Sequence, residues 1–452
     1  GDWSSDVCSS DLEQRRKNLT QLFIPICLET LLYMLSGMVD TLMLSSVNDQ
    51  AVGAVGTANT YIGIFIIMFS VISSGMVAVM TQNIGAGRPG VAYQARQLGL
   101  VFNAALGVIM SLFLSLGAGT ILSGVGVADA LMQPAKTYLQ IVGGFCILNA
   151  LIPICSSYLR AFGFSKEPLY ASIIGNVINF CLNAFFLFVL HKGVAGVATA
   201  TVISRIINLV IVVLLGAVLV KAKQHPERES NRAVMGQIIR IGLPSACETA
   251  IYNVSMTLVI RFLNQMDAQG LNVTARSYTM QITNFSYCVG AALAQANAIM
   301  TGWHIGAKEY DACDRGTKKA AVIGVIVAVI LETVFTLCSG WIMQLFSKDP
   351  QMVSLVGKLL AIDIVLEIGR VTNLVYGQAL KTSGDAVFPV VMGACFMILC
   401  SVGGTYLFGI RLGLLAVGAY IGMTGDECVR AVGMYLRWKS GKWKEKGLVK
   451  SR

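Results

Sequence analysis

Charged residues are scarce in this chain of 452 residues: they make up 13% of it, whereas hydrophobic residues make up 55%. Soluble domains carry about 25% charged residues, so this composition, with a mean hydropathy of +0.69, excludes an ordinary soluble protein and indicates an integral membrane protein. Histidine is rarer still, with only His191, His225 and His304, all in or beside predicted loops. A histidine proton relay or a buried histidine metal site is therefore not expected.

Catalytic motifs are missing as well. The sequence contains no CxxC, no HExxH and no nucleophile elbow. Most of the twelve cysteines lie in apolar runs, where they are expected to pack as small hydrophobic residues and not to form a disulfide or metal framework. We therefore expect neither an enzyme nor a bound cofactor.

Residues 1–12 (GDWSSDVCSSDL) are unlike the rest of the chain. They are rich in Ser and Asp and have neither the basic start nor the apolar centre of a secretory signal. They resemble the translated readthrough of a sequencing adapter, so we expect a leader that is foreign to the natural protein. The alternative is a genuine polar tail.

Long apolar runs dominate the chain after residue 12. A membrane-spanning helix needs about 20 mostly apolar residues, and this criterion predicts twelve spans. They cover residues 19–45, 51–80, 96–121, 136–159, 168–190, 194–220, 237–264, 270–300, 318–343, 354–380, 387–408 and 412–436. The predicted fold class is an all-α integral membrane protein with twelve transmembrane helices.

Lys and Arg are distributed unevenly between the two ends of these spans. If the N-terminus is inside the cell, most of the 34 lysines and arginines lie at the inside ends or in the tail 437–452. This bias places both termini in the cytoplasm. The basic tail is expected to lie on anionic lipid headgroups, with Trp438 and Trp443 at the interface, and it is too short for nucleic-acid binding.

The chain also contains an internal repeat. The pattern Pro-x-x-x-Glu-Thr-x-x-Tyr occurs near the start of each half, displaced by one common interval. Its members are Pro25, Glu29, Thr30 and Tyr33 in the first copy and Pro244, Glu248, Thr249 and Tyr252 in the second. The repeat predicts two six-helix bundles, 13–220 and 237–436, joined by a cytoplasmic linker, 221–236. Because six spans return the chain to its starting side, both bundles share one orientation, related by a pseudo-two-fold axis along the membrane normal.

Three acids in the first and seventh spans are candidate binding residues. Glu29 lies about 15 Å along the first span, near the bilayer midplane, and Glu248 has a similar depth. Tyr33 and Tyr252 extend the same polar stripes, and Asp40 lies near the first of them. Inserting a carboxylate into the membrane within a spanning helix costs roughly 2.5–3.5 kcal/mol of free energy. An acid at such a position therefore indicates a functional site. The alternative is a permanently protonated acid that is hydrogen-bonded to a neighbour.

The tenth span carries a second group of charges on one helix face. Glu367 and Arg370 are expected to pair, which leaves Asp363 as an unpaired acid; structural and substrate-binding roles remain open for all three. Glu332 in the ninth span is a further buried acid without a sequence clue to its role. Asp426 and Arg430 are expected to form an i,i+4 pair.

Several motifs in order resemble those of the multidrug and toxic compound extrusion (MATE) transporters. The likeness covers essentially everything after residue 12. It is carried by Met38-Val39-Asp40-Thr41, Gly175-Asn176 with Asn179 and Leu182-Asn183, Glu367-x-x-Arg370-x-x-Asn373, Lys381-x-x-Gly384-Asp385, and Arg437-x-x-Ser440-Gly441-Lys442-Trp443.

This resemblance implies two six-helix bundles and the efflux of organic cations in exchange for sodium ions or protons. Asp40 matches the family's first-span acid, which is implicated in cation coupling, and Asn179 matches an amide near that acid. Asn183 occupies a position where some members carry aspartate. A sodium site is therefore expected near Asp40 and Asn179.

Our hypothesis is a cation-coupled antiporter of a bacterial inner membrane that exports small organic cations, acts as a monomer and contacts membrane lipid but no nucleic acid. The acids Glu29, Asp40 and Glu248 would supply negative potential for both cargoes. One alternative is a lipid-linked precursor flippase of the same superfamily, which needs a cationic cavity. An intramembrane enzyme or a channel is a more distant alternative.

Overall fold

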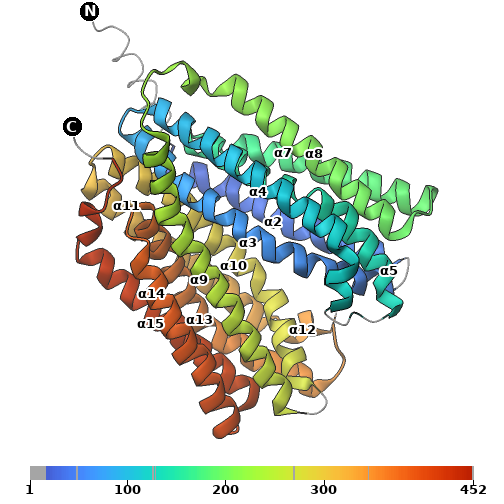
Figure 1. Ribbon diagram of the computed structural model, residues 1–452. Helices are drawn as coiled ribbons and strands as arrows, with labels where there is room; N and C mark the ends of the chain where they lie inside the picture. Colours follow the sequence, from blue (N-terminus) through green and yellow to red (C-terminus); the bar gives the residue numbers. More distant parts are fainter. Residues whose placement is uncertain are drawn as a thin grey trace, which may run out of the picture. The chain divides into compact units, whose positions relative to one another are not determined.

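The computed structural model describes residues 17–46, 49–124, 127, 129–267, 270–344 and 346–449, and these ranges contain helices and no strands. The leader expected to be foreign, 1–12, lies outside the described residues. Each of the twelve predicted spans corresponds to one helix or to a run of consecutive helices (Figure 1). The prediction of an all-α protein with twelve spans in two groups is confirmed.

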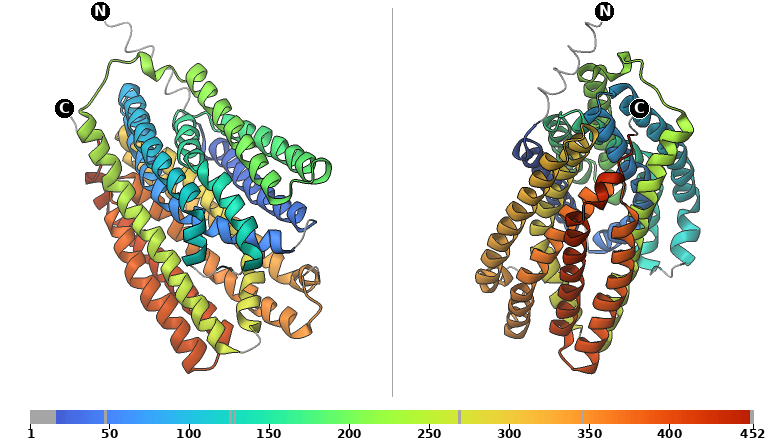
Figure 2. Two further views of the ribbon diagram at one scale, coloured as in Figure 1. Left: turned by 45° about the vertical axis from the view of Figure 1, so that its right-hand side comes forward. Right: turned by 90° about the vertical axis from the view of Figure 1, so that its left-hand side faces the viewer.

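The chain divides into two compact units, the first of which ends at Leu243. Its packing joins helices that are neighbours in sequence, such as α3 with α4, and helices far apart in it, such as α2 with α7. Helices α7 and α8 lie side by side in both views of Figure 2. They are α2 (Leu19–Ser45), α3 (Asp49–Gly85), α4 (Pro89–Gly124), α5 (Asp129–Tyr138), η1 (Leu139–Gly143), α6 (Ile147–Ala161), α7 (Lys166–Ala184), η2 (Phe185–Val189), α8 (Gly193–Leu219) and η3 (Lys221–Gln224).

The second unit begins at Pro244, within α9. In it α13 packs against α10, α11 and α15 and is the central helix. Its elements are α9 (Asn231–Met266), α10 (Leu271–Gly306), α11 (Tyr310–Leu337), α12 (Ser339–Met343), α13 (Pro350–Thr382), α14 (Val387–Phe396), η4 (Met397–Val402), η5 (Thr405–Arg411), α15 (Leu415–Lys439) and η6 (Lys442–Glu445).

The start of α9 belongs to the first unit because it packs tightly there. A Cβ atom on Gly242 would collide with the backbone carbonyl of Val71 in α3, and one on Gly75 would collide with that of Ile238. Just before α9, Arg88 forms a 2.7 Å ion pair with Glu229. The helix begins at Asn231, inside the segment predicted as a linker, and passes from one unit to the other at Pro244.

Several spans are not simple α-helices. The fourth is bent by 43° between Asp129–Gly143 and Ile147–Ala161. π-Helical turns occur in the fourth, fifth and eleventh spans as η1, η2, η4 and η5. Such turns widen a helix and often accompany functional sites, and η2 begins two residues after Asn183.

Length and composition alone identify fewer spans than the structure contains. Among the described residues, seven helices are long and apolar enough to cross a membrane, or eight if the bent fourth span is counted as one. The helices that fail this test are α9, α10, α13 and α15. These four carry many of the polar and charged side chains of the second unit.

The basic tail does not place its tryptophans at a lipid interface, so this expectation is wrong. Trp438 and Trp443 are each 1% exposed, and their rings stack at 4.1 Å. Trp438 Nε1 donates a hydrogen bond to Asp314 at the start of α11, and Arg437 forms a 2.7 Å ion pair with Asp385. The tail therefore packs against the protein through its two buried indoles.

Candidate functional site

Asp40 is the centre of the polar group in the first unit. Asn183 Nδ2 donates a 2.7 Å hydrogen bond to its Oδ1, and a second one of 3.2 Å to Asn179 Oδ1. Both asparagines come from α7, one turn apart, and are buried, whereas Asp40 is partly exposed. Among the described residues, none forms an ion pair with Asp40. The group thus offers carboxylate and amide oxygens, which hard cations prefer.

One charge acts on this acid from a distance, and one aromatic side chain lies two turns away on the same helix. Arg205 of α8 acts on Asp40 electrostatically without forming an ion pair with it. Tyr33, on the same helix as Asp40, is 71% exposed. An exposed ring two turns from a partly exposed carboxylate, on a similar side of one helix, suits an extended organic cation, which gains from both the charge and the aromatic face.

Glu29 is paired with a cation. Its Oε2 lies 2.5 Å from Nη2 of Arg160, in the last turn of α6, and Ser172 donates a 3.3 Å hydrogen bond to its Oε1. The two side chains are 15% and 11% exposed. The ion pair joins the first and fourth spans and offsets the charge of Glu29.

The second unit repeats this arrangement. Glu248 Oε2 lies 2.5 Å from Nζ of Lys381, in the last turn of α13. Arg160 and Lys381 occupy nearly equivalent positions of the two repeats, as Glu29 and Glu248 do. The expectation that Glu29 and Glu248 supply uncompensated negative charge is therefore corrected, because each acid has a cation from the span three further along.

A larger charge network fills the core of the second unit. Arg430 of α15 forms two 2.8 Å hydrogen bonds with Asp426 and a 2.9 Å ion pair with Glu427. Arg370 of α13 pairs with Glu367, three residues earlier, and lies 3.7 Å from Glu427. The predicted pairs Glu367–Arg370 and Asp426–Arg430 are thus both present.

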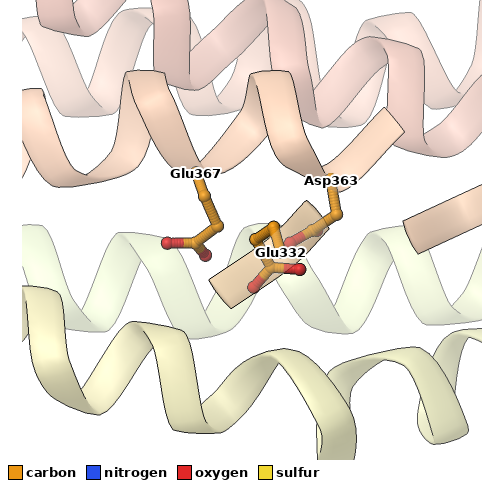
Figure 3. A group of neighbouring side chains, drawn as sticks. All are labelled: Glu332, Asp363 and Glu367. Carbon is orange, nitrogen blue, oxygen red and sulfur yellow. The ribbon is translucent and has the colours of Figure 1, made fainter. Parts of the chain in front are cut away.

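Three carboxyl groups converge at one end of this network. Glu332 from α11 extends between Asp363 and Glu367 of α13 (Figure 3), and one oxygen of each lies within 4.8 Å of the others. All three are at most 1% exposed. Asp363 has no ion-pair partner in the part of the chain that the structure describes, as expected from its sequence position, and Glu332 joins it from the neighbouring helix.

Comparison with known proteins agrees with this architecture. A family model described as MatE matches residues 25–185 and 244–407, which together make up most of the chain. The chain belongs to the MATE family. Its two matched segments correspond to the two repeats.

Relatives of this MATE chain include an uncharacterized transporter, YisQ, of Bacillus subtilis. It is 34% identical over 96% of both chains. The probable multidrug resistance protein NorM of Thermotoga maritima is 23% identical, covering 97% of this chain and 95% of the relative. The chain is therefore a multi-pass membrane protein whose relatives are named as transporters and not as enzymes.

Solved structures share the fold of this MATE chain. A MATE protein in a straight conformation matches with a TM-score of 0.84 at 19% identity, covering 96% of this chain and 99% of the other. A MOP superfamily transporter from Pyrococcus furiosus, described as having a binding pocket of reverse polarity, matches with a TM-score of 0.82 at 18% identity, covering 97% and 99%.

The candidate residues of the MATE chain fall into separate groups within each unit. Asp40, Asn179 and Asn183 come together, and so do Asp363, Glu367 and Arg370. Tyr252 is 37% exposed and acts electrostatically on Arg370. Sequence reasoning missed the partners Arg160, Lys381 and Glu427. The sequence contains a signal for Arg160 and Lys381, because a basic residue recurs at the same position of both repeats, just as the glutamate does.

Proposed function

We propose that this MATE chain is a secondary active antiporter that exports small organic cations in exchange for Na⁺ or H⁺ by alternating access. The observation that carries the proposal is the state of Asp40: a partly exposed carboxylate in an apolar span, oriented by Asn183 and without an ion-pair partner among the described residues. A carboxylate in that position is costly unless a cation or proton joins it. It therefore provides a site for which two cationic cargoes compete.

Competition at one acid accounts for obligatory exchange. A cargo shifts a two-state equilibrium only through its differential affinity for the two states. If the coupling ion and the organic cation use the same carboxylate, each must leave before the other binds. The membrane potential is worth about 2.3 kcal/mol per elementary charge per 100 mV, but one-for-one exchange of monovalent cations moves no net charge. The concentration gradient of the inward ion therefore drives export.

The chemistry near Asp40 supports lipophilic cations as cargo. Tyr33 of the same helix is exposed, and because it lies two turns before Asp40, on a similar side of the helix, it supplies aromatic surface along the face that carries the acid. Relatives named as probable multidrug resistance proteins are consistent with this choice.

We further infer a bacterial inner membrane location, a monomer in contact with lipid, and cytoplasmic termini, the last from the distribution of Lys and Arg.

The flippase alternative has less support. A pyrophosphate group needs surplus positive charge, but Arg370 and Arg430 of the second unit are each matched with two acids. Arg276 of the same unit is also buried, but it is a single cation. The acids in this network outnumber the cations.

The test is ethidium exchange in proteoliposomes, with Na⁺ and pH gradients imposed separately. We expect one of the gradients to drive exchange in the wild type, and Asp40→Asn to abolish it while the protein stays monodisperse. The matched control is Asp129→Asn, an exposed acid at the start of α5 in the same unit, which should behave as the wild type. Gradient-driven exchange that survives in Asp40→Asn, or unitary currents in a bilayer recording, would contradict the proposal.

A further inference from the structure

Arg205 of the sixth span is a cation that the proposed exchange does not use. It lies in α8, about 18 Å along the helix from Gly193 at 1.5 Å per residue. The side chain is partly exposed, and it forms neither an ion pair nor a hydrogen bond with any residue that the structure describes. An unpaired charge at this depth of a spanning helix is costly and indicates a functional site.

Other arginines of the first unit have partners that hold their charge. The carboxylate of Glu29 lies 2.5 Å from Arg160, and the guanidinium of Arg96 lies 4.7 Å from the centre of the Tyr158 ring. Arg205 has neither kind of partner in the described part of the chain. None of its guanidinium nitrogens is among the buried side-chain atoms without a partner, so a ligand can reach them.

The surroundings of Arg205 include the candidate cation site. The guanidinium acts electrostatically on Asp40 of α2, on Tyr138 of α5 and on Cys146, which directly precedes α6. Asp40 and Tyr33 act on Tyr138 in the same way. Arg205 is therefore directed toward the polar group around Asp40 and belongs to it.

The packing of α7 brings the two opposite charges to one side of the unit. Asn183 of α7 donates its 2.7 Å hydrogen bond to Asp40. On the same helix, a Cβ atom on Gly175 would lie 3.5 Å from the backbone oxygen of Ser204, the residue before Arg205. Helix α8 also contacts α2 directly. Three packed helices thus hold the carboxylate and the guanidinium in one group without joining them in an ion pair.

Two opposite charges that are close but unpaired are able to hold two different groups of one ligand. The carboxylate of Asp40 suits a cationic nitrogen, and the planar guanidinium of Arg205 matches a carboxylate through two parallel N–H···O bonds. A cargo with only a positive charge is repelled by Arg205. A cargo with both charges neutralises both residues.

We propose that Arg205 binds the carboxylate of a cargo whose cationic group is bound by Asp40, so that this unit selects zwitterionic organic molecules over simple organic cations. The inference rests on the proposed function, because it takes Asp40 as the site of the cargo's positive charge. It adds a second binding residue and narrows the substrate class. Simple organic cations still bind through Asp40, but more weakly.

Equilibrium binding of two matched dyes to the purified full-length chain tests this selection. Tetramethylrhodamine methyl ester is a cation, whereas its free acid, tetramethylrhodamine, lacks only the methyl group and is a zwitterion at neutral pH. Binding is followed by fluorescence anisotropy at neutral pH in sodium-free buffer. We expect the wild type to bind the free acid about tenfold or more tightly than the ester, the effect of one hydrogen-bonded contact between charged groups.

Variants of Arg205 then assign the selection to its charge. Arg205→Gln should weaken binding of the free acid by about tenfold or more, while the ester binds equally well or more tightly because the repulsion is gone. These different responses separate recognition from a structural role, since damage to the fold weakens both dyes. Arg205→Lys should retain most of the binding of the free acid. The matched control is Lys192→Gln, an exposed cation directly before α8, which should leave both dyes unaffected.

An affinity of the wild type for the free acid that is equal to or below that for the ester would overturn the proposal, even if no Arg205 variant folds. Binding of the free acid that is indifferent to Arg205→Gln, or a parallel loss of both dyes, would overturn it as well. Asp40→Asn identifies a failure of the proposed function itself. If saturable binding of the ester persists in that variant, Asp40 is not the cation site and both proposals fall.

Discussion

Arg160 of α6 lies 2.5 Å from the carboxylate of Glu29 in α2, and the two side chains are mostly buried. The same relationship recurs between Lys381 and Glu248 in the other repeat. A duplicated acid and a duplicated cation thus form a duplicated ion pair. This finding shows that Glu29 and Glu248 each join two spans through an ion pair.

The first prediction concerns this ion pair. Glu29→Gln leaves the Arg160 charge without its carboxylate, and breaking a buried pair in this way costs about 3–5 kcal/mol. We expect a clearly lower melting temperature in detergent. The double variant Glu29→Gln with Arg160→Gln should recover much of the loss, because no uncompensated charge remains. A melting temperature for Glu29→Gln equal to that of the wild type would show that the pair does not stabilise the fold.

The amide next to Asp40 gives the second prediction. Asn183→Ala removes the 2.7 Å hydrogen bond that orients the carboxylate, and a bond to a charged group contributes about 1.5–3 kcal/mol. We expect cation binding at Asp40 to weaken by about tenfold or more. The matched control is Asn176→Ala, at a partly exposed position of the same helix, which should bind normally. Equal binding by both variants would refute the orienting role of Asn183.

Arg430 provides the third prediction. Arg430→Met leaves Asp426 and Glu427 buried without the cation that holds both, so we expect a loss of about 3–5 kcal/mol of stability. Lys439→Met, which removes a positive charge from the exposed end of the same helix, should leave the melting temperature nearly unchanged. If the two variants melt alike, the network is not a structural core.

A fourth prediction concerns Asp267, between α9 and α10. Its carboxylate accepts hydrogen bonds from the backbone N–H groups of Leu271 and Asn272. Desolvation opposes ionisation here, but these hydrogen bonds outweigh it and lower the pKa of Asp267 below its usual range. The stabilisation is therefore complete above the ordinary pKa of Asp, about 3.9, and is lost as the pH falls through the lowered folded-state pKa.

Asp267→Ala should accordingly cost about 1 kcal/mol at neutral pH, the usual effect of losing a helix cap. Melting temperatures of this variant and the wild type should converge below about pH 4. A difference that stays constant from pH 7 to the acid range would contradict the hydrogen-bond explanation.

Much of the fold was predictable because apolar runs in a membrane protein have a single structural outcome. The predicted first span, 19–45, coincides with α2, and the prediction also succeeded for α13 and α15, which carry charge. The partners of the acids were less predictable. Contacts within one helix, such as Glu367–Arg370, follow from spacing. Those between helices, such as Glu332 with Asp363, depend on how each helix is rotated about its axis, which composition does not reveal.

The C-terminal tail, 437–452, shows the same limit of prediction from sequence. A run of lysines with two tryptophans is typical of a lipid interface, but the same indoles also stack well on each other. Trp438 and Trp443 form a parallel pair with an interplanar angle of 8°, which was not readable from their spacing.

The most direct measurement of the exchange account is the binding of tetraphenylphosphonium, an organic cation, to the purified protein at increasing concentrations of the coupling ion. The account predicts competition: the apparent Kd for tetraphenylphosphonium rises in proportion to the Na⁺ or proton concentration, and this dependence disappears in Asp40→Asn. Simultaneous binding of both cations, with an affinity for tetraphenylphosphonium that does not change across the titration, would contradict it.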